Sequence, residues 1–182
     1  MNDDAEDRRP GPWGRLSRGR RVTVVVLALA VVWLLSAVPF PGYDIPSEAS
    51  QPTVQRGDHV RVNRWAYAYG DPDRGDLVVF DALAGQRPGR RLSRVVAIGG
   101  DIVEGRGGGL VVNGQSVTES YLAAGTRTSD FQPVTVAKGS VFVLGDNRNN
   151  SADSRLYGPI LGPLLRGRVM MITRPLGHIG LL

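Results

Sequence analysis

The sequence predicts a mainly β protein with one apolar helix near its N-terminus. An apolar stretch runs from Val22 to Val38, interrupted only by Thr23 and Ser36, and short β-type runs fill the chain after Pro41. The 182 residues include 24 Gly and 12 Pro, a content that favours a turn-rich domain over a helical bundle. This length suits one domain of ordinary size.

The apolar stretch, extended to Phe40, has 19 residues. It predicts a helix of roughly 28 Å at about 1.5 Å per residue, which just spans a hydrocarbon core of about 30 Å. Pro39 and Pro41 would end this helix, because proline lacks the N–H group and clashes with the preceding turn. We therefore predict a transmembrane anchor over residues 22–40 and an exported domain over residues 41–182.

Six arginines precede the apolar stretch: Arg8, Arg9, Arg15, Arg18, Arg20 and Arg21. By the positive-inside bias, they place the N-terminus in the cytoplasm and the chain after Pro41 outside the cell membrane. Residues 1–21, acidic and then basic, predict a disordered cytoplasmic tail. A cleaved signal peptide would give the same orientation. An uncleaved anchor is favoured, because the stretch is long for a signal peptide and prolines crowd the point of cleavage.

The composition excludes several kinds of site. The chain has no cysteine, so disulfides, a cysteine nucleophile and thiolate metal ligands are impossible. The net charge of +5 rests on 21 Arg and one Lys, but the arginines are scattered and no nucleic-acid motif accompanies them. We expect a solvated basic surface near anionic lipid, no nucleic-acid partner and no cofactor. Neither His59 nor His178 has a spaced partner that would indicate a metal site.

Short runs separated by Gly, Pro, Asp and Asn clusters predict the strands of the exported domain. His59–Asn63 alternates with period two, as a half-buried strand does. Asn113-Gly114 predicts a tight hairpin, because both residues tolerate a positive φ angle. The other expected strands are Leu77–Phe80, Ser93–Ile98, Asp101–Glu104, Leu110–Val112, Gln115–Val117, Val134–Ala137, Val141–Leu144 and Arg168–Ile172.

Five blocks, in order, resemble the sequence pattern of the type I signal peptidases, membrane-bound serine proteases that remove signal peptides from exported proteins. The blocks are Ile45–Thr53, Gly57–Arg64, Arg74–Phe80, Ser93–Asp101 and, most specific of all, Gly145–Pro159. The resemblance covers nearly all of residues 44–172. It implies an antiparallel β domain whose apolar surface rests on the membrane, with exported preproteins or signal peptides and membrane lipid as partners.

Two departures from this pattern fall on the residues that the family uses for catalysis. The family's first block reads Pro-Ser-x-Ser-Met-x-Pro-Thr, and its second Ser is the nucleophile. Counting from Pro46, or back from Pro52-Thr53, puts that position at Ala49. The family's general base is the Lys of Lys-Arg-Val, where this chain has Ser93. A methyl group cannot attack a carbonyl, and a neutral Ser cannot take the proton that a Lys of lowered pKa would take.

Other residues offer only weak replacements for this pair. Ser50 follows the nucleophile position, but in an extended segment its side chain would point to the opposite face, so it more simply replaces the family's Met. Lys138 lies in an Ala-Lys-Gly turn and is expected to be solvated. His59 should lie on the polar side of its strand, and His178 carries no motif.

Residues that would support catalysis are present. By the resemblance, Ser47 helps a backbone N–H group to stabilise the oxyanion, and Ser151 orients the base. Asp153 and Arg155 match a charge pair that supports the site. Asp146, Asp153 and Arg155 can equally hold loops through ion pairs and capping. With no base left to orient, we expect that structural role.

Three functions remain open from the sequence. The first is a family member that has lost catalysis and binds exported peptides, as a chaperone or assembly factor. The second is an active signal peptidase with displaced chemistry that uses Ser50. The third is a structural membrane module without activity or peptide binding. The missing Ser–Lys pair favours the first over the second, and the well-kept first block favours it over the third.

Overall fold

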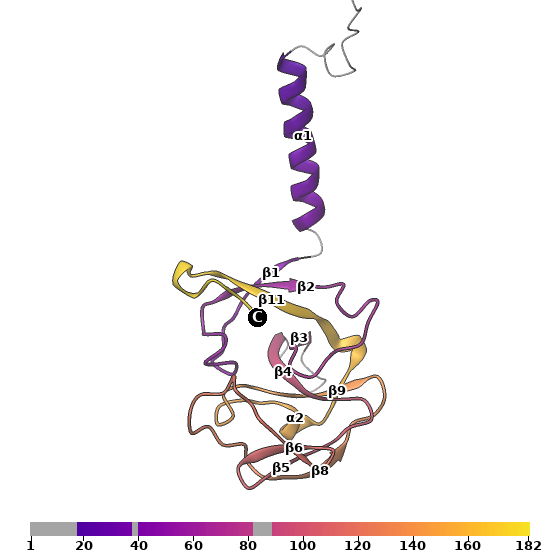
Figure 1. Cartoon of the computed structure of the whole chain (residues 1–182), viewed down its shortest axis with the longest axis vertical. Helices are drawn as coiled ribbons and strands as arrows, with labels where there is room; N and C mark the ends of the chain where they lie inside the picture. Colours follow the sequence, from indigo (N-terminus) through magenta and orange to yellow (C-terminus); the bar gives the residue numbers. More distant parts are fainter. Residues whose placement is uncertain (1–17, 38–39, 82–88) are drawn as a thin grey trace, which may run out of the picture. The chain divides into compact units, whose positions relative to one another are not determined.

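The computed structural model describes residues 18–37, 40–81 and 89–182 (Figure 1). The chain divides into two compact units, residues 1–38 and 39–182. Residues 1–17, most of the expected cytoplasmic tail, lie outside the described residues.

The first unit contains helix α1, Arg18–Ala37. It begins four residues before the expected Val22, because arginine is a good helix former and continues the helical turn. It ends at Ala37, two residues before Pro39. Large apolar side chains are exposed along it, among them Val22, Leu27 and Trp33. In the part of the chain that the structure describes, no helix is long and apolar enough to cross a membrane, so the expected transmembrane span is not confirmed.

The second unit is built on two antiparallel sheets, as expected for a mainly β domain. In the described residues, the larger sheet has eight strands in the order β1-β2-β11-β3-β4-β9-β10, and β12 pairs with β11 (Figure 1). The strands are β1 (Gly42–Asp44), β2 (His59–Asn63), β3 (Leu77–Asp81), β4 (Arg90–Ile98), β9 (Ser140–Leu144), β10 (Ile160–Leu161), β11 (Leu165–Arg174) and β12 (Gly180–Leu181). The described residues of this unit also form three short helices: α2 (Ser154–Tyr157), η2 (Gly162–Leu164) and η3 (Leu176–His178).

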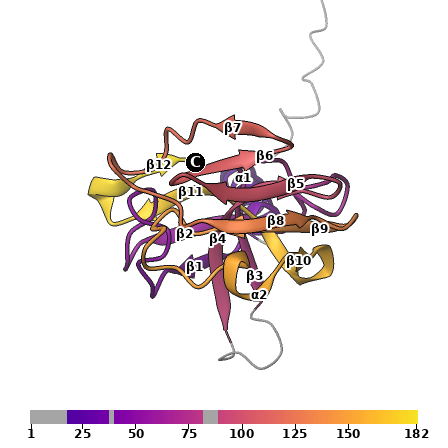
Figure 2. The same ribbon diagram turned by 90° about the horizontal axis from the view of Figure 1, so that it is seen from below.

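The smaller sheet has the strand order β7-β6-β5-β8, and its strands run side by side in Figure 2. They are β5 (Ile102–Arg106), β6 (Gly109–Val112), β7 (Gln115–Val117) and β8 (Phe131–Thr135). The predicted hairpin is confirmed: β6 pairs with β7, and the two turn residues have φ angles of 53° at Asn113 and 78° at Gly114.

Several strands differ from their expected bounds, most of all β4, β8 and β11, and β11 covers Leu165–Arg174 and not Arg168–Ile172. β8 covers Phe131–Thr135 and not Val134–Ala137. Pro133 argued against a strand in the sequence, but β8 is an edge strand, where the missing N–H group of proline is tolerated. β4 begins at Arg90 and not at Ser93, because its pairing with β3 reaches back to the Arg90–Asp81 pair. β1, β10 and β12 have only two or three residues, too few to show a sequence period.

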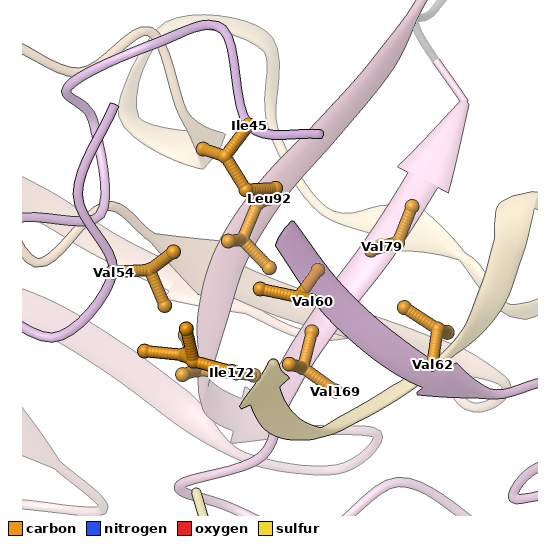
Figure 3. Close-up of a cluster of buried hydrophobic side chains, with 9 residues drawn as sticks. Ile45, Val54, Val60, Val62, Val79, Leu92, Val169 and Ile172 are labelled. Carbon is orange, nitrogen blue, oxygen red and sulfur yellow. The ribbon is translucent and has the colours of Figure 1, made fainter. Parts of the chain in front are cut away.

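One apolar cluster fixes the segment that carries Ala49. Ile45 and Val54, at either end of this segment, pack beside side chains of β2, β3, β4 and β11 (Figure 3). The cluster comprises Ile45, Val54, Val60, Val62, Leu77, Val79, Leu92, Val169 and Ile172. Each buried Val or Leu contributes about 1.5–3 kcal/mol relative to exposure, so the ends of the loop are held firmly against the sheet.

A second anchor joins the two sheets at Asp101, between β4 and β5. Its carboxylate accepts hydrogen bonds from Arg74 Nε (2.9 Å), the Ile98 backbone N–H (2.8 Å) and Asn113 Nδ2 (2.9 Å). Burial raises the pKa of Asp101, but these donors have the larger combined effect and lower the pKa to about 2. The carboxylate is therefore charged at neutral pH and holds the hairpin β6–β7 to the turn before β3.

Candidate active site

Three segments far apart in the sequence line one cleft of about 580 Å³. They are the loop after β1, the first half of β4 and the loop after β9. The lining residues are Pro46, Ser47, Glu48, Ala49, Arg56, Gly89, Arg90, Arg91, Leu92, Ser93, Asn150 and Ala152. Ala49 and Ser93, the two positions that the resemblance assigns to nucleophile and base, therefore face the same space.

The loop that carries Ala49 is not extended, contrary to our expectation. It turns, with backbone hydrogen bonds from Gln51 N to Glu48 O (3.2 Å) and from Val54 N to Ser50 O (2.9 Å). The loop after β9 holds it from the other side, because Asn147 N donates to Ala49 O at 3.0 Å. This contact requires Gly145, since a Cβ atom there would lie 2.6 Å from Ala49 O and 2.2 Å from Ser151 Oγ.

Ser151 thus lies close to the backbone of Ala49, the nucleophile position of the family pattern. Within the described residues, Ser151 Oγ is buried and has no hydrogen-bond partner. A buried, unpaired hydroxyl costs free energy, and each such group in a folded protein calls for an explanation. By the resemblance, Ser151 would orient a lysine amine, and Ser93 has no amine.

Ser50 is directed away from the cleft. Its side chain is 1% exposed, and its Oγ donates a hydrogen bond to Leu92 O at 3.1 Å. It does not line the cleft that contains Ala49 and Ser93. The expected direction of Ser50 is therefore right, although the cause is a turn and not strand alternation.

The other candidate bases lie elsewhere. Lys138 is exposed in a turn and lines a separate cleft with Tyr67. His59 Nδ1 lies 2.7 Å from Asp44 Oδ1, and His178 Nδ1 lies 3.0 Å from Asp58 Oδ1; all four residues line another cleft, near η3. None of these residues lines the cleft of Ala49 and Ser93.

Asp146 belongs to a buried ion pair beneath the cleft. Its carboxylate accepts hydrogen bonds from Arg94 Nε (2.9 Å), Arg94 Nη2 (2.6 Å) and Thr53 Oγ1 (2.6 Å). The Arg94 guanidinium also lies over the Tyr121 ring, 4.0 Å from its centre. The pair therefore ties β4 and the loop after β9 to the end of the loop that carries Ala49. Sequence reasoning missed Arg94, although it directly follows the base position.

Asp153 and Arg155 form a second ion pair, with Arg155 Nη2 2.8 Å from Asp153 Oδ2. The Asp153 carboxylate also accepts hydrogen bonds from the backbone N–H groups of Gly145 (3.0 Å) and Arg155 (3.2 Å), so it caps α2. Arg155 Nη2 donates in addition to Arg148 O at 2.8 Å. These contacts shape the loop that carries Ser151.

A third pair, Arg148 with Glu119, was also missed. Arg148 donates to both Glu119 oxygens, at 2.8 and 2.6 Å, and to Gly145 O at 3.1 Å. Burial lowers the pKa of Arg148, but Glu119 raises it more, so the net shift is upward. Arg148 lies in the block Gly145–Pro159 that resembles the family, which was the only signal in the sequence for this pair.

A second cleft, of about 610 Å³, adjoins the first and shares with it Pro46, Ser47, Gly89, Arg90, Arg91 and Leu92. We call the two clefts together the groove. The strand β4 forms its floor. β9 pairs with β4 only from Arg94 to Ile98, so in the described structure the β4 residues from Arg90 to Ser93 have a strand partner, β3, on one side only.

Comparison with known proteins gives a consistent family. Residues 18–173 match the family model described as signal peptidase, peptidase S26. The chain is 34% identical to the probable signal peptidase I-2 of Synechocystis sp. over 165 residues, 88% of this chain and 73% of that protein. It is 34% identical to signal peptidase I of Leptolyngbya laminosa over 164 residues, covering 86% and 77%. A solved signal peptidase I of Enterococcus faecalis has 31% identity and a TM-score of 0.47, over 54% of this chain and 97% of that one.

Proposed function

Because the chain belongs to the signal peptidase family, peptidase S26, we propose that it binds exported polypeptides in its groove without cleaving them. The observation that carries this proposal is the content of the first cleft. Ala49 and Ser93 face it together: Ala49 has no reactive group, and no Lys or His among the described lining residues would activate the Ser93 hydroxyl group as a nucleophile. The hydroxyl group of Ser50, the nearest substitute, is bound to Leu92 O.

Binding is supported by the unpaired side of β4. An extended peptide can add to a free strand edge through main-chain hydrogen bonds, while its alternate side chains enter neighbouring pockets. The Leu92 carbonyl group already accepts from Ser50 Oγ, so a bound peptide would pair with other main-chain groups of β4. The groove along Arg90–Ser93 would supply the pockets.

The test uses the purified full chain and a fluorescently labelled preprotein. We expect saturable binding by fluorescence anisotropy and no processed product by mass spectrometry. Ala49→Trp should weaken binding by filling the cleft, whereas Ala137→Trp, at an exposed position outside the groove, should not. Turnover at an ordinary protease rate that Ser50→Ala abolishes would instead favour displaced chemistry. Neither binding nor turnover would favour a structural module.

We also propose that α1 anchors the protein in the cell membrane, with the tail in the cytoplasm and residues 41–182 outside. Support comes from the exposed apolar side chains of α1 between Val22 and Leu34, since a helix segment that is apolar all round is normally buried in protein or lipid. The arginines before Val22 support the orientation.

Protease added to cells stripped of their outer layers should digest the β unit and spare the tail, as followed with epitope tags at the two ends. Digestion of the tail alone would contradict this orientation. Release of the intact chain by a carbonate wash would contradict the anchor.

A further inference from the structure

Three arginines line the groove beside the unpaired side of β4. Arg56, Arg90 and Arg91 line the first cleft, and Arg90 and Arg91 also line the second. Arginine keeps its charge at any physiological pH, and its planar group offers five N–H donors. They give the groove a positive charge. Main-chain hydrogen bonds to a peptide would not need this charge.

Among the described residues, no carboxylate forms an ion pair with these arginines. Arg91 Nε is buried without a hydrogen-bond partner, and in the described part of the chain no ion pair involves Arg56, Arg90 or Arg91. Arg90 instead lies over the Tyr43 ring, 4.7 Å from its centre, which holds its guanidinium group at the groove wall.

The carboxylates near the arginines are mostly occupied. In the second cleft, Asp44 is paired with His59 at 2.7 Å and Asp81 is paired with Arg166. In the first cleft only Glu48 carries a negative charge, and its side chain is exposed. The groove therefore has donors and positive charge in excess of the acceptors that the described residues provide.

We propose that the groove selects peptide segments that carry a carboxylate, which Arg91 binds with help from Arg90 and Arg56. This inference rests on the proposed function and adds to it the chemical class of the bound segment. A guanidinium group can bind a carboxylate with two parallel hydrogen bonds, so the arginines that line the groove suit this ligand. The carboxylate can belong to an Asp or Glu side chain or to the C-terminus of the peptide.

The experiment measures the affinity of four short Ala-Gly peptides for the full chain in nanodiscs of zwitterionic lipid. In the first pair both ends are blocked, and one peptide carries a central Asp where the other carries Asn. In the second pair neither peptide has Asp or Asn, and one ends in a free C-terminus where the other is amidated. We expect the peptide with the preferred carboxylate to bind roughly tenfold more tightly than its neutral twin, the size of a charged hydrogen-bond contribution. The Asp and C-terminal arms identify which carboxylate is used. The ratio should fall as salt is raised, because the groove is open to solvent.

Arg91→Gln should abolish this preference, and Arg91→Lys, which keeps the charge but not the planar donor pair, should retain only part of it. Arg64→Gln is the matched control, because Arg64 is exposed and lines neither cleft. If Arg91→Gln unfolds the chain, Arg90→Gln with Arg56→Gln, both at exposed positions, serves as the second variant.

Equal affinity for charged and neutral peptides would overturn this inference and leave peptide binding intact. No affinity for any peptide would overturn both. Binding to phosphatidylglycerol vesicles that Arg91→Gln abolishes, with no preference among the peptides, would assign the arginines to lipid and overturn the inference as well.

Discussion

Ala49→Ser combined with Ser93→Lys should raise the peptidase activity of the chain. The two positions face one cleft, so the new hydroxyl group and amine would share the space that the substrate enters. Ser93 is 2% exposed, and burial at this position would lower the pKa of a lysine and favour its neutral, proton-accepting form. By the resemblance, the unpaired Ser151 hydroxyl group would then orient this amine.

The expected effect is large because nucleophile and base act as a unit. In a well-studied serine protease, losing either residue costs about 10⁶ in kcat, and losing both costs little more. We therefore expect a gain of at least about 10²-fold in the double variant and no gain in either single variant. Cleavage of a preprotein, followed by mass spectrometry, is the measurement.

Two controls make this result interpretable. Addition of Ser50→Met tests whether the family's Met raises the activity of the double variant. Position 50 is only 1% exposed, so the larger side chain also costs stability. Circular dichroism checks that a buried lysine has not unfolded the domain. A folded double variant that leaves several preproteins intact would mean that the groove does not present a peptide bond to position 49.

Asp146→Ala should destabilise the β unit by about 3–5 kcal/mol, because it leaves Arg94 charged and unpaired in the interior. The Asp146 side chain is 0% exposed and that of Arg94 is 10% exposed, so water cannot replace the lost carboxylate. Denaturant unfolding of parent and variant measures the change in the free energy of unfolding.

A matched surface pair shows whether burial is the cause. Arg166 and Asp81 form the same kind of pair, with side chains 44% and 33% exposed. Asp81→Ala should therefore cost no more than about 1 kcal/mol. Equal costs for the two substitutions would refute the buried-charge explanation. A double variant, Arg94→Met with Asp146→Leu, should recover most of the loss, since an apolar pair can replace a buried ion pair.

Much of the fold followed from local patterns. The period of His59–Asn63 and the Asn113-Gly114 turn predicted β2 and the β6–β7 hairpin, because side-chain alternation and a positive φ angle are properties of a few adjacent residues. The ends of β4 and β8 were missed for the opposite reason. They depend on how far a neighbouring strand pairs, and Pro133 is allowed only because β8 lies at an edge.

The sequence by itself predicted that Ala49 and Ser93 stand at the two positions that the family uses for catalysis, by counting within blocks that resemble the family. Only the tertiary structure decided what their neighbours do. The loop after β1 turns and directs Ser50 to Leu92 O, and Ser151 Oγ and Arg91 Nε are buried without partners among the described residues. These contacts form where side chains from distant segments meet. Contacts between distant segments produce no periodic pattern in the sequence.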